Sequence, residues 1–333
     1  MSGGFLTADL LGTPAWLWLS FAGLVTALLA LDLGVLHRKN KEIGTRESLL
    51  LSAFYISVGL AFGAYVWWAR GAEAGTLYMT GFLVEKSLAM DNIFVIAMIF
   101  TTLAVPRIYQ HRVLFWGIIG VVVLRAIMIG FGAAIVESFS WVLYIFAALL
   151  ILTGIKMWFS GDEAHDIGDS KLLNWLRRRF RVTDELHGER FFVQQRDPGS
   201  GRMVRTMTPL FLALVMVELA DVIFAVDSIP AIFAITTDTF IVYTSNVFAI
   251  LGLRALYFAL SAMVDRFKYL KHALALLLVF IGSKIFVADL FGLAKFPPMA
   301  SLGITFAILA GGIPYSLWRT APGRGGTALP ASD

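Results

Sequence analysis

Apolar residues run along this chain in long blocks that are separated by short polar segments. A block of about twenty apolar residues is long enough for an α-helix to cross the hydrocarbon core of a bilayer. Nine blocks reach this length, and they predict transmembrane helices at Ala15–Leu36, Leu49–Trp68, Leu77–Leu103, Val113–Val136, Trp141–Phe159, Met207–Thr236, Phe240–Met263, Leu270–Leu290 and Pro298–Trp318. The pattern therefore predicts an all-α polytopic membrane protein with nine spans.

These helices divide the chain into four parts. Residues 1–159 carry the first five spans, residues 160–206 form a loop, residues 207–318 carry four more spans, and residues 319–333 form a tail. Within the loop, Ser170–Arg181 has the periodicity of an amphipathic helix that lies on a membrane surface. Phe191–Gln195 and Met203–Thr206 flank an Asp-Pro-Gly-Ser-Gly turn and predict a short hairpin. The tail is rich in Gly, Ala and Pro, so we expect it to be disordered.

The amino-acid composition narrows the class of protein further. Hydrophobic residues make up 58% of the 333 residues and the mean hydropathy is +0.78, which excludes an ordinary soluble protein. The chain has no cysteine, so it offers neither a disulfide framework nor a thiolate metal site. The net charge of +4 comes from basic residues between the apolar blocks, and it does not indicate a nucleic-acid partner.

Basic residues between the blocks are distributed very unequally. Twenty of the 27 Lys and Arg residues fall on one side of the predicted membrane, counting Lys271 at the very start of the eighth block, whereas Arg70 and Lys295 fall on the other. By the positive-inside rule, we expect the amino terminus outside and the carboxyl terminus in the cytoplasm. This orientation makes the loop at 160–206 cytoplasmic.

Three sequence landmarks occur twice in the same order. In the first landmark, Glu85 and Asp91 correspond to Asp221 and Asp227. In the second, Leu124-Arg125-Ala126 corresponds to Leu253-Arg254-Ala255, and in the third, Gly154-Ile155-Lys156 corresponds to Gly282-Ser283-Lys284. The predicted topology gives spans 3–5 and spans 6–8 opposite directions, so the two three-helix units are inverted copies. Inverted repeats are typical of secondary transporters, whose substrate site lies near the membrane midplane between the halves.

Carboxylates inside the predicted spans are the strongest functional signal. Intramembrane charges are costly and usually mark a transport site or a proton path. The candidate metal ligands are Glu85, Asp91, Asn92, Glu218, Asp221 and Asp227, with Asp32, Ser228, Asn246, Lys86, Arg125 and Arg254 as accessory candidates. Carboxylate and amide oxygens suit a hard divalent cation such as Mg²⁺, Ca²⁺ or Mn²⁺. Acids that share a low-dielectric site also offer a route for exchanging protons against the metal.

Helix geometry limits which acids can share one ion. Residues six apart on a straight helix point about 120° apart, so Glu85 and Asp91 cannot both face one ion unless the helix unwinds. Pro230 removes a backbone donor and is expected to bend or unwind the helix beside Asp227. Asp91 and Asp227 lie deepest in their spans by residue count and match each other in the repeat, so we expect them to form the central pair.

A structural interpretation competes with this one. The acids would then neutralise Arg125, Arg254 and the intramembrane lysines in ion pairs, and Arg125 and Arg254 could also stand in for a cation when the site is empty. Lys156 and Lys284 lie near span ends, where their ammonium groups could reach the membrane interface. Asn246 could simply join two helices.

The two acidic motifs resemble those of a known family. Glu85-Lys86-Ser87-Leu88-Ala89-Met90-Asp91-Asn92, the run from Glu218 to Thr237, and Thr244-Ser245-Asn246 with Gly252-Leu253-Arg254-Ala255-Leu256-Tyr257 are similar to the TerC family, most closely its Alx branch. The resemblance covers about the whole chain. It implies efflux of a divalent metal, chiefly manganese, across the bacterial inner membrane and supply of metal to exported enzymes. It also implies that Glu85, Asp91, Glu218, Asp221 and Asp227 are the functional acids.

The resulting hypothesis is a secondary transporter that exports Mn²⁺, with no prosthetic group and with proton antiport. Its partners would be the metal ion, protons and the bilayer, while secretion or metal-delivery partners and self-association stay open. One alternative is a carrier for another ion, such as Ca²⁺, Na⁺ or an oxyanion; tellurite is disfavoured because an anion would meet many carboxylates. A second is a non-transporting scaffold that docks a partner through residues 160–206. An enzyme is least favoured, because no motif places a nucleophile beside a base.

Overall fold

The computed structural model describes residues 7–34, 44–159, 175, 182–183, 185–196, 202–260, 269–293 and 296–320. The side chains of Asp32 and Asp91 lie outside the described set. So do the predicted amphipathic helix, apart from one residue, and the tail from residue 321.

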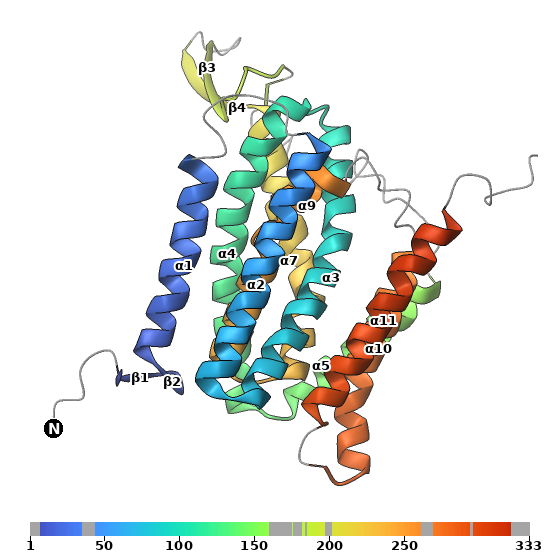
Figure 1. The fold of residues 1–333 in the computed structure, drawn as a ribbon. Coiled ribbons are helices and arrows are strands. Elements are labelled where there is room, and N and C mark those ends of the chain that lie inside the picture. The colour runs from blue at the N-terminus through green and yellow to red at the C-terminus, as the bar shows by residue number, and fades with distance from the viewer. Residues whose placement is uncertain are drawn as a thin grey trace, which may run out of the picture.

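The described chain is almost entirely helical (Figure 1). Its helices are α1 (Ala15–Gly34), α2 (Thr45–Arg70), α3 (Ala72–Thr102), α4 (Arg107–Ser138), α5 (Val142–Phe159), α7 (Pro209–Ile235), α8 (Thr239–Ile250), α9 (Leu253–Leu260), α10 (Leu270–Leu290) and α11 (Pro298–Arg319). Two antiparallel pairs of strands complete the fold: β1 (Asp9–Leu10) with β2 (Thr13–Pro14), and β3 (Phe192–Arg196) with β4 (Met203–Met207). The second pair is a hairpin at the position that the sequence indicates.

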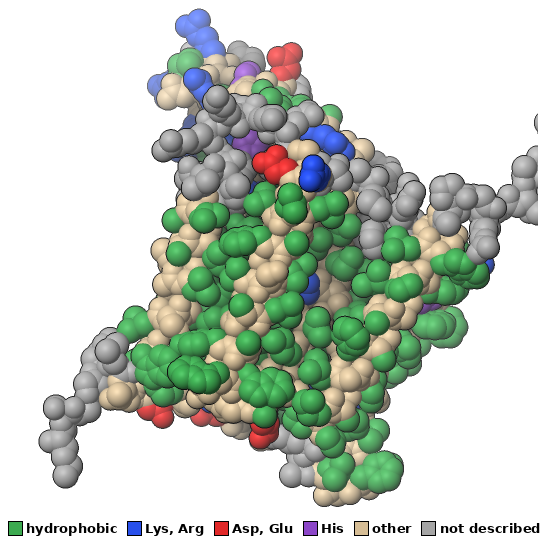
Figure 2. Space-filling model, viewed as in Figure 1, with side chains coloured by type: hydrophobic (Ala, Val, Ile, Leu, Met, Phe, Trp, Pro, Cys, Tyr) green, Lys and Arg blue, Asp and Glu red, His purple; other side chains and the backbone are tan. Residues whose placement is uncertain are grey.

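Several helices have the length and composition of membrane spans. In the part of the chain that the structure describes, seven helical segments meet both requirements, with α8 and α9 taken together as one. Among the segments outside that group, α1 is apolar but shorter, and α3 is 31 residues long and carries Glu73, Glu85, Lys86 and Asp91. Hydrophobic side chains cover the middle of the visible face, and basic side chains gather at the end that carries the hairpin (Figure 2). The fold is that of an all-α polytopic membrane protein.

Helix contacts place the candidate acids in the interior. Helix α3 packs against α2, α7 and α8, and α4 packs against α7. Helices α5 and α10 pack closely along each other, because Gly154 and Gly282 remove side chains at the contact. A Cβ at Gly154 would lie 2.7 Å from the carbonyl oxygen of Ala275, and one at Gly282 would lie 2.6 Å from that of Ala147.

The structure differs from the sequence expectations about helix breaks at two places. Helix α7 continues through Pro230 to Ile235, so the helix does not unwind beside Asp227. All residues from Ser228 to Ile235 are buried, and packing therefore holds this segment in helical form despite the lost backbone donor. The seventh predicted span is instead interrupted between α8 and α9, where Gly252 has a φ of +80°, a backbone conformation that glycine adopts without strain.

Candidate functional site

Arg125 lies at the centre of a buried charged cluster. Its side chain on α4 is 1% exposed, and Asp221 on α7 accepts two hydrogen bonds from it. The donor–acceptor distances are 3.1 Å from Nε to Oδ2 and 2.9 Å from Nη2 to Oδ1. Nη1 also donates to the Glu85 carboxylate on α3 and, at 3.0 Å, to the hydroxyl of Ser228 on α7. One guanidinium thus joins three helices.

Helical periodicity explains why α7 supplies two of these groups. Asp221 and Ser228 are seven residues apart, which is about two turns, so both side chains lie on the face of α7 that contacts α4. Glu85 reaches the same guanidinium from α3, which packs against α7. With both carboxylates ionised the cluster carries one net negative charge, so it can attract a further cation.

A cavity of about 110 Å³ adjoins this cluster. Its polar lining comes from Glu85, Asn92, Arg125, Asp227 and Ser228, and the rest of the wall is apolar. This volume is well above the roughly 10–15 Å³ that one water needs, so the space could hold several waters or a partly hydrated ion. Four of the nine oxygen-donor residues that the sequence singles out therefore line one cavity, namely Glu85, Asn92, Asp227 and Ser228.

Asp227 differs from the other two acids in its partners. It is partly buried, and the hydroxyl of Thr153 on α5 donates to its Oδ1 at 3.1 Å. The ion pairs in the described part of the chain include Glu85 and Asp221 but not Asp227. Asp227 is thus the carboxylate best placed to contribute charge to the cavity. Sequence reasoning missed Thr153, whose only signal was its position directly before the Gly154-Ile155-Lys156 landmark.

Two other candidates have buried polar atoms without a hydrogen-bond partner among the described residues. Oε2 of Glu218 is buried without such a partner, and the carboxylate lies directly against Gly120 of α4. Asn246 on α8 is fully buried, and neither its Oδ1 nor its Nδ2 has a partner there. Buried polar groups of this kind usually interact with water or an ion. Both residues therefore stay candidates, although neither lines the 110 Å³ cavity.

The second intramembrane arginine lies near a smaller cavity. Arg254 is buried, and with Asn92 and Asp221 it lines a space of about 30 Å³. Asn92 also lines the larger cavity, so it stands between the two spaces. The two arginines matched in the sequence therefore lie beside neighbouring cavities.

The structural interpretation of the charges applies to some of them. Glu85 and Asp221 are both paired with Arg125, as that interpretation expects. The expectation that Lys284 reaches the membrane interface is wrong, because its side chain is buried and its Nζ donates to the Ser301 hydroxyl at 3.3 Å. Within the described residues, no group of three or more acidic or histidine side chains has an arrangement that could hold a metal ion. In this conformation, the Arg125 guanidinium pairs with both the Glu85 and the Asp221 carboxylates.

Comparisons with known proteins give a consistent result. The model of the family described as "Integral membrane protein TerC family" matches residues 70–323. A Rickettsia bellii protein named "Uncharacterized membrane protein" is 46% identical over 302 residues, which cover 91% of this chain and 97% of the relative. An Escherichia coli O6:H1 protein named "Putative membrane-bound redox modulator Alx" is 46% identical over 307 residues, covering 90% of this chain and 92% of the relative. No solved structure matches.

Proposed function

Because this chain belongs to the TerC family of integral membrane proteins, we propose that it is a secondary transporter that exports a divalent metal ion, with Mn²⁺ as its cargo, across the bacterial inner membrane in exchange for protons. The observation that carries the proposal is the 110 Å³ cavity, where oxygens of Asp227, Asn92, Glu85 and Ser228 lie beside a guanidinium. Oxygen donors of this kind suit Mn²⁺. The choice of manganese over other hard cations rests on the family resemblance.

In the proposed mechanism, the Arg125 side chain takes the place of the metal ion as the positive partner of the acids when no metal is bound. In the empty state its guanidinium pairs with both Glu85 and Asp221 and offsets one of their two negative charges. A metal ion that enters the cavity meets Asp227 first and then competes with Arg125 for the other carboxylates. Displacement of Arg125 frees those oxygens for the metal, and protons that bind to the acids after the metal leaves complete the exchange.

Helix packing supports the inverted-repeat architecture in this proposal. The first helix of each unit, α3 or α7, packs against the second span of the other unit, α8 or α4. The third helices, α5 and α10, pack against each other through the matched glycines Gly154 and Gly282. A two-fold relation between the units would produce these contacts. Helices α1 and α3 have 20 and 31 residues and are therefore about 30 and 46 Å long, which is enough to cross the hydrocarbon core of a bilayer. We therefore propose that both are spans, in addition to the seven segments above, which gives nine spans.

The name of the E. coli relative raises a different role, that of a redox modulator. This chain contains no cysteine, so it has no thiol for disulfide exchange. Export of a redox-active metal would connect the two descriptions, since the metal content of a cell affects its redox state. We therefore treat the transport activity as primary.

Flux measurements with purified protein test the proposal. The protein is reconstituted into liposomes that contain a metal-sensitive dye or a pH-sensitive dye, and a Mn²⁺ gradient is applied. We expect Mn²⁺ to enter while protons leave, and we expect Asp227→Asn to abolish both movements. Asp289→Asn is the matched control, because Asp289 is exposed at the end of α10 and does not line the cavity, so flux should persist. Wild-type liposomes that move Ca²⁺ or Na⁺ but not Mn²⁺ would contradict the cargo, and liposomes that move no cation would contradict transport itself.

A further inference from the structure

The break between α8 and α9 leaves backbone carbonyls without helical partners. Helix α8 ends at Ile250, Leu251 has the extended angles φ −55° and ψ 132°, and α9 begins at Leu253. The last carbonyls of a helix have no intrahelical donors and carry about half a negative charge in total. The break thus creates a cluster of negative dipoles inside the bundle.

Lys86 on α3 reaches this cluster. Its Nζ lies 3.0 Å from the carbonyl oxygen of Ala249 and 3.4 Å from that of Leu251. The side chain is partly buried, and Lys86 belongs to none of the ion pairs in the described part of the chain. Its ammonium is therefore stabilised by carbonyl oxygens rather than by a carboxylate.

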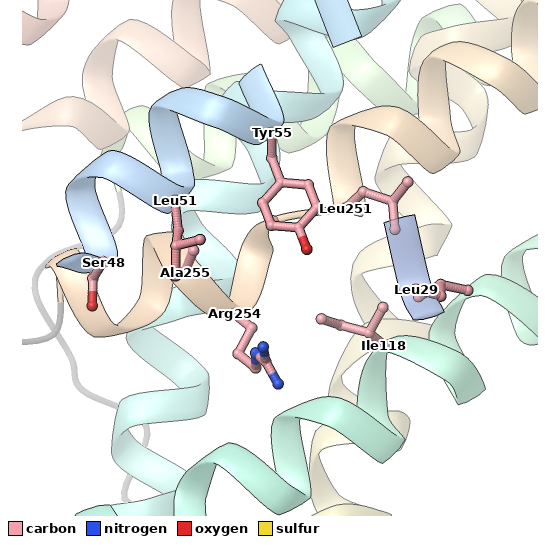
Figure 3. A pocket seen from close by; sticks show the side chains of 9 residues that line it. Leu29, Ser48, Leu51, Tyr55, Ile118, Leu251, Arg254 and Ala255 are labelled. Atoms are coloured by element: carbon pink, nitrogen blue, oxygen red, sulfur yellow. The ribbon is translucent and has the colours of Figure 1, made fainter. Parts of the chain in front are cut away.

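The other side of the break is fixed by tight packing. A Cβ at Gly252 would lie 2.5 to 2.9 Å from side-chain atoms of Tyr55 on α2, so no larger residue fits there. Figure 3 shows Tyr55 and Arg254 at a small cavity beside Leu251. The cavity has a volume of about 10 Å³, close to the space that one water needs. The break is thus a specific feature with polar surroundings and space for about one water.

We infer that the carbonyl end of α8 is a monovalent-cation site that Lys86 occupies with its own ammonium. Carbonyl ends of interrupted helices coordinate Na⁺ in transporters, and a primary ammonium offers the same single charge to the same oxygens. A divalent ion fits poorly, because such ions are usually held by carboxylates, and here the ligands are neutral carbonyls. The native protein would then need no Na⁺ at this position, whereas removal of the ammonium would create a Na⁺ site. This inference is independent of the proposed metal export.

Thermal unfolding of purified variants tests the inference without any transport assay. Melting temperatures of the wild type and of Lys86→Ala are compared in NaCl and in choline chloride at equal ionic strength. We expect Na⁺ to raise the melting temperature of Lys86→Ala by roughly 2–4 °C in a saturable manner, and to leave that of the wild type unchanged. Recovery of folded Lys86→Ala from Na⁺ buffer alone would also support the site.

Two control variants distinguish Na⁺ binding at this site from the general effect of removing a buried charge. Lys284→Ala removes another buried ammonium, whose partner is the Ser301 hydroxyl, and it should show no response to Na⁺. Lys86→Met occupies the same space without charge or oxygen atoms, and it should fold and also show no response. Equal melting temperatures of Lys86→Ala in the two salts would overturn the inference. The same Na⁺ response in Lys284→Ala, or failure of Lys86→Ala to fold in either salt while Lys86→Met folds, would also overturn it.

Discussion

Replacement of Arg125 by Met gives the most direct test of the charged cluster. The change removes all four hydrogen bonds that the guanidinium donates to Glu85, Asp221 and Ser228. Two carboxylates then remain in the protein interior without a counter-charge. Removal of one partner from a buried ion pair typically costs about 3–5 kcal/mol, mainly because the remaining charge stays desolvated. We expect the free energy of unfolding to fall by about that amount.

A compensating variant shows whether unpaired charge causes the loss. Glu85→Gln and Asp221→Asn, added to Arg125→Met, remove the two orphaned charges while they keep similar side-chain volumes. Because the cost of desolvated charge is then gone, the triple variant should be more stable than Arg125→Met by about 2 kcal/mol or more. Chemical unfolding of each purified protein in mild detergent, followed by circular dichroism, measures these differences. The reasoning is refuted if Arg125→Met unfolds within about 1 kcal/mol of the wild type, or if the triple variant is no more stable than the single one.

Metal binding to the Arg125 variant tests the proposed competition. If the guanidinium occupies the position of the cargo, Arg125→Met should be stabilised by Mn²⁺ at lower concentrations than the wild type, because two carboxylates become available. A thermal unfolding titration with Mn²⁺ measures this shift, and Mg²⁺ serves as the comparison ion. An identical Mn²⁺ dependence in both proteins would argue against Arg125 as a competitor for the site.

Two further predictions concern stability. Gly154→Ala should lower the free energy of unfolding by about 1–3 kcal/mol, because the new methyl group would lie 2.7 Å from the backbone carbonyl oxygen of Ala275. Gly303→Ala meets no atom within 4 Å and should change the free energy of unfolding little. Equal effects of the two substitutions in denaturation would contradict this prediction. Asp238→Ala should lower the free energy of unfolding by about 1 kcal/mol more than Arg70→Ala does. The reason is that Asp238 both pairs with Arg70 at 2.8 Å and accepts a hydrogen bond from the first turn of α8. A larger loss of stability in Arg70→Ala, in the same measurement, would refute this prediction.

The sequence by itself determined the helices and the inventory of charged residues within them. Apolar blocks of about twenty residues define helices, because local length and hydrophobicity are enough for that purpose. The hairpin between β3 and β4 was also evident, since its turn residues are a local signal. The six-residue spacing of Glu85 and Asp91, repeated in Asp221 and Asp227, identified the acids without any structure.

Only the tertiary structure decided how those residues are paired. Arg125 could have met any nearby acid, and the packing of α4 and α3 against α7 brings it to Glu85 and Asp221. Pro230 signalled a break that packing suppressed, while Gly252 marks a break that its contact with Tyr55 fixes. Lys284 is buried because α10 packs against α5 and α11, although its place near a span end suggested exposure. Each of these outcomes depends on contacts between residues far apart in the chain, and hydrophobic periodicity carries no information about them.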